Sequence, residues 1–282
     1  MIRLQRGAAS TEIAPELGGA VMRLQIASHD ILRPAPAGAT DVLQSGCFAL
    51  APYCNRIRDG RFAFQGEAVR LAPNMGDHPH PLHGDGWRSA WAVDTLGEAA
   101  ASLTVDHAPG EWPWAWRARQ AFTLRDDGLR IDLELTNTDR RSMPAGLGLH
   151  PYFPAPPGTS LRAEVDGVWM SDGEALPTTH HRGSWGPDWR QGAPTAADRL
   201  IDHCYTGWAG RAELSGPDGV TTLITASPAC RWAHVYSPPG AGFVCVEPVT
   251  HMPDPFNHPD SGLAILAPGE SLSMWMDITV RS

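Results

Sequence analysis

Ile131-Asp132-Leu133-Glu134-Leu135-Thr136 is the stretch that decides the fold, because apolar and polar residues alternate along it without interruption. Side chains on a β-strand point alternately to its two faces, so this pattern predicts a strand with one buried and one solvated face. The run from Trp116 to Leu124 precedes it, and Asp126-Asp127-Gly128 joins the two. Asp-Gly supplies the positive φ angles of a tight turn, which predicts an antiparallel hairpin.

The same pattern extends over the rest of the chain. A second hairpin is predicted around Pro217-Asp218-Gly219, between residues 211–214 and 220–224. The 26 Pro and 29 Gly interrupt most segments before a helix could exceed a couple of turns, and Thr195 to Leu200 is the best helix candidate. We therefore predict an all-β fold, a large antiparallel β-sandwich. With no repeat or linker visible, residues 1–282 are expected to form a single domain.

Composition narrows the classes of partner. The formal net charge is −9 and no Lys/Arg cluster is present, which argues against nucleic acid and against anionic membrane surfaces. Residues 1–7 lack the apolar core of a signal peptide, and no apolar stretch is long enough to span a bilayer, so we expect a cytoplasmic protein. The five cysteines are scattered without Cys-x-x-Cys spacing, which indicates buried reduced thiols.

Two distant segments each place a titratable group at the end of an apolar run: Gly148-Leu149-His150-Pro151-Tyr152-Phe153 and Val244-Cys245-Val246-Glu247-Pro248. A histidine can release a proton near neutral pH and a carboxylate can accept one, and burial tunes the pKa of both. His150 and Glu247 are therefore a candidate acid and a candidate base for proton transfer without a cofactor.

A third segment, Asp77-His78-Pro79-His80-Pro81-Leu82-His83-Gly84, holds three histidines in six residues and raises the possibility of a metal site. The prolines prevent a regular strand from directing alternate imidazoles to one point, and no Glu follows at a short spacing. A loop histidine that hydrogen-bonds a substrate is favoured over a metal ligand, and His83 is the candidate. Surface or structural roles remain open for the other two histidines.

Loops rich in Trp, His and Pro mark the expected binding cleft. Residues 75–91 and 183–189 are such loops, and a sandwich places its binding cleft between loops of this kind. Sugars stack on aromatic faces, so Trp87 or Trp185 is a candidate for the floor of the cleft.

Several of these segments, taken in order, resemble the motifs of the aldose 1-epimerase (galactose mutarotase) family. The matching segments are Asn55-Arg56-Ile57 with Gly60-Arg61-Phe62 and Gly66, Asn74 with Leu82-His83-Gly84, His150-Pro151-Tyr152-Phe153, Ile201-Asp202-His203-Cys204-Tyr205, and Glu247 with Pro253-Asp254 and Asn257. One such motif alone is weak support, whereas five in order over most of the chain are specific.

The resemblance implies a β-supersandwich of the galactose mutarotase type that interconverts the α and β anomers of a free aldose, with no cofactor and no metal. It implies Glu247 as base at the anomeric hydroxyl and His150 as acid at the ring oxygen. Arg56, His83 and Asp202 would hold sugar oxygens, with Asn55 supporting Arg56. The expected partner is a small-molecule monosaccharide, and the expected assembly a monomer or homodimer.

Blander roles stay open for individual residues. His150 could cap a strand, Asp202 could cap a turn, and Arg56 could pair with Asp59 on the surface. A non-catalytic carbohydrate-binding protein would reuse the same fold without needing the acid and the base.

The preferred sugar is less well defined than the chemistry. Many galactose mutarotases show Glu-Thr-Gln where this chain has Glu247-Pro248-Val249, and Asp85 follows His83-Gly84 where glycine is common. Arg56, Arg58 and Arg61 would point to one side of an extended segment and could bind a phosphorylated or sulfonated sugar. A solvated basic edge explains these arginines more simply, so a neutral aldose is predicted.

Overall fold

The computed structural model describes residues 1–183, 185–196 and 198–281, and these are nearly all in β-strands and their connections. The described residues include no α-helix, only three short 3-10 turns: η1 (Val42–Gln44), η2 (Arg58–Gly60) and η3 (Pro255–Asn257). Among the described residues, no helix is long and apolar enough to cross a membrane.

The helix expected over Thr195 to Leu200 is wrong. Residue 197 lies outside the described residues, and the others in this segment form bends or have no regular structure. Thr195 is tied to its neighbours instead of opening a helix: its amide donates to the Thr159 carbonyl, and its own carbonyl accepts from the Ser237 hydroxyl. The Thr195 carbonyl, which would accept an intrahelical bond at a helix start, is thus bonded to Ser237 instead.

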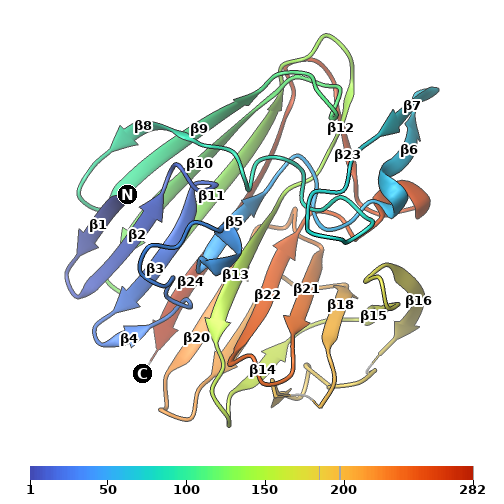
Figure 1. Cartoon of the computed structure of the whole chain (residues 1–282). Helices are drawn as coiled ribbons and strands as arrows, with labels where there is room; N and C mark the ends of the chain where they lie inside the picture. Colours follow the sequence, from blue (N-terminus) through green and yellow to red (C-terminus); the bar gives the residue numbers. More distant parts are fainter. Residues whose placement is uncertain (184, 197, 282) are drawn as a thin grey trace.

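Two large antiparallel sheets form a sandwich, which confirms the predicted fold class (Figure 1). The first sheet has 11 strands. In spatial order these are β1 (Ile2–Arg6), β2 (Ala9–Ala14), β3 (Ala20–Ile26), β5 (Cys47–Leu50), β13 (Gly148–Pro154), β22 (Phe243–Val249), β21 (Trp232–Ser237), β18 (Ile201–Thr206), β15 (Gly167–Ser171) and β16 (Pro177–Arg182), with β4 (His29–Asp30) paired to β3.

The second sheet has nine strands. Their spatial order is β17 (Ala193–Pro194), β14 (Ser160–Ala163), β19 (Arg211–Ser215), β20 (Thr221–Ala226), β24 (Ser271–Arg281), β11 (Gly128–Asn137), β10 (Trp116–Arg125), β9 (Ala100–His107) and β8 (Ala92–Leu96). The last strand in sequence, β24, therefore lies in the middle of this sheet. Two small hairpins complete the fold: β6 (Arg61–Phe64) with β7 (Glu67–Arg70), and β12 (Met143–Ala145) with β23 (Ala264–Leu266).

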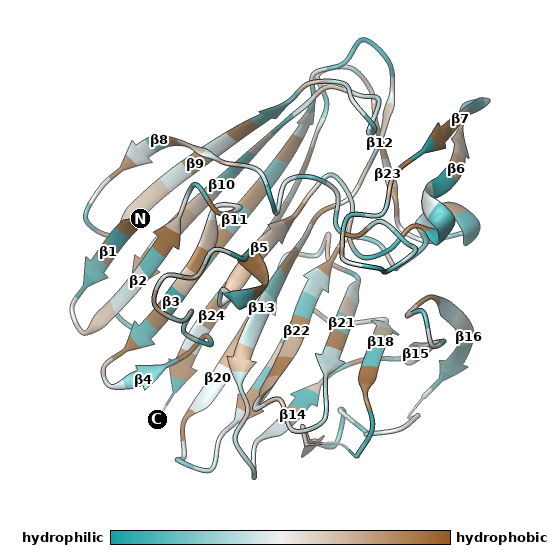
Figure 2. Cartoon of the chain, in the orientation of Figure 1, coloured by the Kyte–Doolittle hydropathy of each residue, from teal (hydrophilic) through white to brown (hydrophobic). Residues whose placement is uncertain are grey.

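Both predicted hairpins are present. β10 and β11 pair from Trp116 opposite Asn137 to Arg125 opposite Gly128, so Asp126-Asp127 forms the tight turn. β19 and β20 pair around Pro217-Asp218-Gly219. Ile131, Leu133 and Leu135 are buried in the core, as their alternation predicts, and Figure 2 shows the corresponding alternating bands along the strands.

The apolar side chains divide into two groups, one on each face of the 11-stranded sheet. Leu149, Val244 and Val246 belong to the main core with residues of the nine-stranded sheet. Phe48, Tyr152 and Cys245 belong to a second cluster on the other face, here called the site face. Neighbouring residues of β13 and β22 thus serve the core and the site alternately. All five cysteines are buried free thiols, as predicted.

Candidate active site

Adjacent strands place titratable side chains in one row across the site face. Phe48 of β5 pairs with His150 of β13, Glu247 of β22 pairs with His234 of β21, and His234 pairs with Cys204 of β18. His150 and Glu247 lie opposite each other between the pairs Gly148–Val249 and Tyr152–Cys245. Residues opposite one another on neighbouring strands have side chains in contact range, so the sheet register itself assembles the site.

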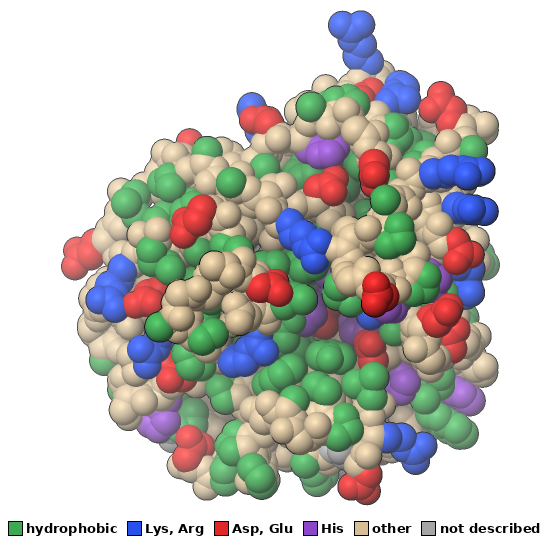
Figure 3. All heavy atoms as spheres, viewed as in Figure 1, with side chains coloured by type: hydrophobic (Ala, Val, Ile, Leu, Met, Phe, Trp, Pro, Cys, Tyr) green, Lys and Arg blue, Asp and Glu red, His purple; other side chains and the backbone are tan. Residues whose placement is uncertain are grey.

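A cavity of about 380 Å³ opens over this row. Its lining residues are Arg33, Leu43, Asn55, Arg56, Met75, Leu82, His83, His150, Tyr152, Asp202, His234, Tyr236, Phe243 and Glu247. Figure 3 shows the face that contains this hollow, with histidine and acidic side chains visible inside it. The volume falls in the range of small-molecule sites. All six residues proposed from the sequence, from Asn55 to Glu247, lie in this cavity.

His150 and Glu247 form a close buried couple at its base. His150 Nε2 lies 3.3 Å from Glu247 Oε1, and Glu247 is 2% exposed. Burial raises the pKa of Glu247 to about 8, against the lowering effect of the nearby His234 charge. Burial also lowers the pKa of His150 to about 3. Two groups this close titrate together, so between those pH values the couple holds one transferable proton.

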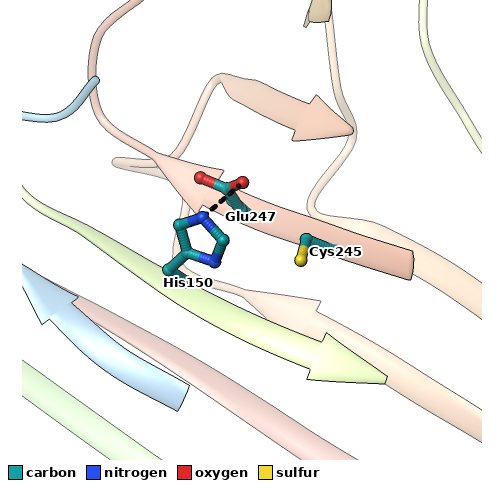
Figure 4. Close-up of side chains that lie close together, drawn as sticks. All are labelled: His150, Cys245 and Glu247. Carbon is teal, nitrogen blue, oxygen red and sulfur yellow. Dashed lines mark ion pairs between the residues drawn. The ribbon is translucent and has the colours of Figure 1, made fainter. Parts of the chain in front are cut away.

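Cys245 lies beside this couple, on the same strand as Glu247 (Figure 4). Its sulfur, one His150 ring nitrogen and one Glu247 oxygen all lie within 4.8 Å of one another. Burial, and after it the neighbouring Glu247, raises the pKa of the Cys245 thiol well above its usual value. The thiol is therefore neutral and acts as a packing group beneath the couple.

Asp202 and His234 form a second couple next to the first. His234 Nε2 lies 2.5 Å from Asp202 Oδ1, and Arg56 Nη1 lies 3.9 Å from Asp202 Oδ2. Burial opposes both charges, yet the hydrogen bond and charge of Asp202 raise the pKa of His234 to about 10. The same bond lowers the pKa of Asp202 against its own burial. This couple is an ion pair at neutral pH.

Asn55 and His83 hold each other in place across two loops. The Asn55 backbone amide donates to His83 Nδ1 at 2.9 Å, and the His83 backbone amide donates to the Asn55 backbone carbonyl at 3.0 Å. Both have positive φ angles, 57° and 62°, a conformation that a non-glycine residue adopts only when its surroundings impose it. Because Nδ1 accepts a bond, the His83 proton lies on Nε2, free to donate to a ligand.

Arg56 is oriented by groups around it. Asn55 Oδ1 accepts from the Arg56 amide at 2.9 Å and from Arg56 Nη1 at 3.2 Å, while Arg56 Nε lies 3.3 Å from His78 Nε2. The neighbouring Asp59 points elsewhere and forms no ion pair with Arg56. The guanidinium is thus directed into the cavity with its fork fixed.

Asp254 fastens the Arg56 segment from the far end of the sequence. Its amide donates to the Arg56 carbonyl at 2.7 Å, and its fully buried carboxylate accepts from the Arg58 amide at 3.0 Å and from Asn257 at 2.8 Å. This contact gives the Pro253-Asp254 motif a role in positioning. It also turns Arg58 away from the cavity, so Arg56, Arg58 and Arg61 do not form the single-sided array considered from the sequence.

Of the three clustered histidines, His78 and His80 contact each other with ring centroids 5.4 Å apart, while His83 lies apart from them. His78 contacts Arg56, His80 lies near Asp59 and Glu174, and His83 enters the cavity. The cluster therefore does not converge on one point. Within loop 75–91, Met75, Leu82 and His83 line the cavity, which places this loop where the sequence suggested.

Neither tryptophan proposed for the floor of the cleft lines it. Trp87 is fully buried behind His83 and stacks on Phe48, and Trp185 is 51% exposed and stacks on His181. The aromatic lining comes from Tyr152, Tyr236 and Phe243. The Trp87 indole packs behind the site, where its full surface is buried.

The sequence reasoning missed His234, Tyr236 and Arg33. A signal for the first two was present, since His234 and Tyr236 alternate with Ala233 and Val235 and so share the polar face of one strand. Arg33 gave no signal. It reaches the cavity because its Nη2 donates to the carbonyls of Leu43 and Ser45, at 2.5 and 2.8 Å, and its guanidinium lies over the Tyr152 ring.

Comparison with known proteins shows the family of the chain. Residues 1–279 match the family model described as aldose 1-epimerase. The uncharacterized protein YphB of Escherichia coli K12 is 31% identical over 297 aligned positions, which cover 99% of this chain and 98% of YphB.

Solved structures show the same fold. A protein of Escherichia coli K12, provisionally assigned as an aldose 1-epimerase, has a TM-score of 0.92 at 29% identity, with 99% of this chain and 98% of that chain covered. A galactose mutarotase-like protein of Clostridium acetobutylicum has a TM-score of 0.87 at 20% identity, with 99% and 94% covered, which shows the fold alone. The matches span the whole site, and the chain belongs to the aldose 1-epimerase family.

Proposed function

We propose that this protein is an aldose 1-epimerase, or mutarotase, that interconverts the α and β anomers of a free neutral aldose. The observation that carries the proposal is the buried couple of Glu247 and His150, 3.3 Å apart at the base of a sugar-sized cavity. Opening a cyclic hemiacetal removes a proton from the anomeric hydroxyl and adds one to the ring oxygen. Both oxygens are bonded to the anomeric carbon, so the reaction needs an acid and a base side by side.

The couple holds a single proton, and the reacting form is the one that carries it on His150 with Glu247 ionised, although the raised pKa of Glu247 and the lowered pKa of His150 favour the opposite arrangement. Glu247 takes the anomeric proton while His150 gives its proton to the ring oxygen, and the C1–ring oxygen bond breaks to leave an open-chain aldehyde. The couple still holds one proton, now on Glu247. After rotation about the C1–C2 bond the transfers reverse, the ring closes as the other anomer, and the enzyme returns to its starting state. Nothing is consumed, so the chemistry needs no external carrier.

The other cavity residues would hold the sugar. His83 offers its Nε2–H, Arg56 offers a fixed guanidinium, and Asp202 offers a carboxylate oxygen, each to a hydroxyl or the ring oxygen. Asn55 supports Arg56 through the bonds described above. Tyr152, Tyr236 and Phe243 provide aromatic surface for the apolar face of the ring.

A second candidate substrate class, a sugar with an acidic group, is favoured by Arg33. This residue lines the cavity and forms no ion pair with a carboxylate of the described residues. Its Nη2 is committed to backbone carbonyls, but Nε–H and Nη1–H could bind a phosphate, sulfonate or carboxylate. The neutral aldose remains the proposal because a packed guanidinium on an aromatic ring also has a structural role.

Anomer exchange followed by NMR on freshly dissolved sugars tests the function, with and without chelator. We expect the protein to accelerate exchange of glucose, galactose or a pentose, and Glu247→Gln to serve as the inactive control. Sugar binding without acceleration would instead identify a carbohydrate-binding protein. If glucose 6-phosphate or a 6-sulfonated sugar were used more than tenfold better than any neutral aldose, the acidic substrate class would replace the neutral one. Arg33→Gln should then remove that advantage.

A further inference from the structure

His234 lies between the two couples of the site, on the strand next to the proposed base. In the register of β21 and β22 it is directly opposite Glu247, and its Nε2 is bonded to Asp202 of β18. Its side chain is only 3% exposed and contributes to the cavity wall. No step of the proton transfer described above uses it.

The charge of His234 is fixed by its partner. A 2.5 Å contact between a buried imidazole and a buried carboxylate is a charge-assisted hydrogen bond, and breaking the charge separation would leave Asp202 uncompensated. The pKa of His234, raised to about 10 by the hydrogen bond and charge of Asp202 despite burial, agrees with this geometry. His234 is therefore an imidazolium at the pH where the site would work.

Several charged or titratable groups face Glu247 from the surrounding elements. They are His150 from β13, His234 from β21, Asp202 from β18, Arg56 from the loop before η2, and Cys245 from β22 itself. Two of these are cations, and Arg56 already lies against Asp202 and Asn55. His234 is the cation that stands directly across the strand from Glu247.

We propose that His234 is a positioning residue for anomer interconversion: held in its charged form by Asp202, it stabilises the ionised carboxylate of Glu247 from the neighbouring strand. The proposal rests on the function proposed above. Without this cation, a carboxyl buried between His150 and apolar strand residues holds its proton more tightly, because burial disfavours the charged form. Asp202 thereby has a second task, in addition to any contact with sugar, which is to keep His234 charged.

His234→Gln tests the proposal, because glutamine can still donate to Asp202 but carries no charge. In this variant we expect the couple to lose its proton at a pH at least one unit higher than in the wild type. The alkaline limb of the kcat/KM profile should move up by that amount. At pH 7, kcat should fall by up to about tenfold with KM nearly unchanged, since the ionised form of Glu247 becomes rarer.

His203→Gln is the matched control, one residue from Asp202 on the same strand. His203 Nδ1 accepts from the Ser171 amide at 3.2 Å and burial lowers the pKa of its ring, so it carries no charge to lose. Its pH profile should match the wild type. A folded His234→Gln variant with an unmoved alkaline limb would overturn the proposal and leave His234 as a structural residue.

Two spectroscopic measurements decide the question without sugar turnover. Nitrogen-15 NMR of the wild-type histidines should show His234 as an imidazolium up to at least pH 8, and a neutral ring at pH 7 would overturn the proposal even if the variant fails to fold. Carbon-13 NMR of the Glu247 carboxyl should show its titration midpoint directly, at a higher pH in His234→Gln than in the wild type. Absence of mutarotation with both titrations as expected would reject the proposed function while the electrostatic coupling stands.

Discussion

Two ion pairs, one on each large sheet, have similar distances and very different surroundings. On the nine-stranded sheet Arg117 of β10 lies opposite Asp106 of β9, with Nε 2.7 Å from the carboxylate and side chains 59% and 64% exposed. On the site face, His234 and Asp202 are 2.5 Å apart with side chains 3% and 12% exposed. Water screens the first pair, whereas the second contributes to the pKa shifts of His150, Tyr236 and Glu247.

Burial, more than residue choice, therefore makes the site face chemically distinct. A cross-strand pair of opposite charges is an ordinary feature of an antiparallel sheet. Under the loops that carry Arg56 and His83, burial raises the pKa of the Glu247 carboxyl beside such a pair to about 8, where it can exchange protons near neutral pH.

Glu247→Gln is expected to have the largest effect. The amide keeps the shape of the side chain but cannot accept the anomeric proton, so kcat/KM for anomer exchange should fall on the order of a hundredfold or more, as for other general bases. Polarimetry measures the loss, and circular dichroism checks the fold. Near wild-type mutarotation by a folded variant would reject Glu247 as the base.

The same substitution should stabilise the protein at alkaline pH. Because the pKa of Glu247 is raised from 4.5 to about 8 by folding, the wild type loses stability as pH rises between these values, since the unfolded chain ionises there while the buried carboxyl keeps its proton. Glutamine cannot ionise, so at pH 9 the variant should be more stable by up to about 5 kcal/mol in urea unfolding. Equal stability at pH 5 is the internal control.

His150→Asn should reduce kcat by a similar factor, on the order of a hundredfold, while leaving sugar binding in place. The ring oxygen would lose its acid, but the residues that hold the hydroxyls remain. Calorimetric titration with the best sugar separates the two effects. Loss of all binding would make His150 a positioning residue and weaken the case for the couple as the reacting unit.

Raising the pH should have a smaller effect on the wild type: on the alkaline side of its profile, kcat/KM should fall about tenfold per pH unit. The couple holds one shared proton below a pKa of about 8, and losing that proton leaves a base without an acid. The value of kcat/KM should therefore be level around neutral pH and fall as pH rises through 8. A profile that instead rises through pH 8 would mean that ionised Glu247 acts beside a neutral His150.

Arg117→Gln is the exposed counterpart and should have the smallest effect. Removing this partner of Asp106 should leave the free energy of unfolding nearly unchanged and leave mutarotation untouched. Urea unfolding at low and high salt measures the change. A destabilisation comparable to that expected for a buried ion pair would show that exposure is not what separates the two pairs.

Much of the fold was predictable because the alternation of apolar and polar residues is local. The strand at Ile131 to Thr136 and the turn at Asp126-Asp127 depend on neighbours in sequence, and both are found as expected. The helix predicted near Thr195 is absent because Thr195 bonds to Thr159 and Ser237, both more than 35 residues away in sequence. No local pattern reveals such partners.

The site divides in the same way. His150 and Glu247 stood out because each ends an apolar run, and the family motifs located Arg56, His83 and Asp202. His234 escaped notice because its importance comes from the register that places it opposite Glu247, and register between β21 and β22 is a property of the folded sheet. The shifted pKa values could not be foreseen either, since they depend on burial.

The central place of β24 has a consequence for how this protein is made. The strand fills the gap between β20 and β11, with Leu133 opposite Met274, yet it is synthesised after both. Until it emerges from the ribosome, the sheet remains two pieces with unpaired edges, a state open to wrong pairing with other chains. Asp254, whose amide donates to the Arg56 carbonyl, also follows Arg56 by almost 200 residues, so a working pocket is completed only once translation has passed Asp254.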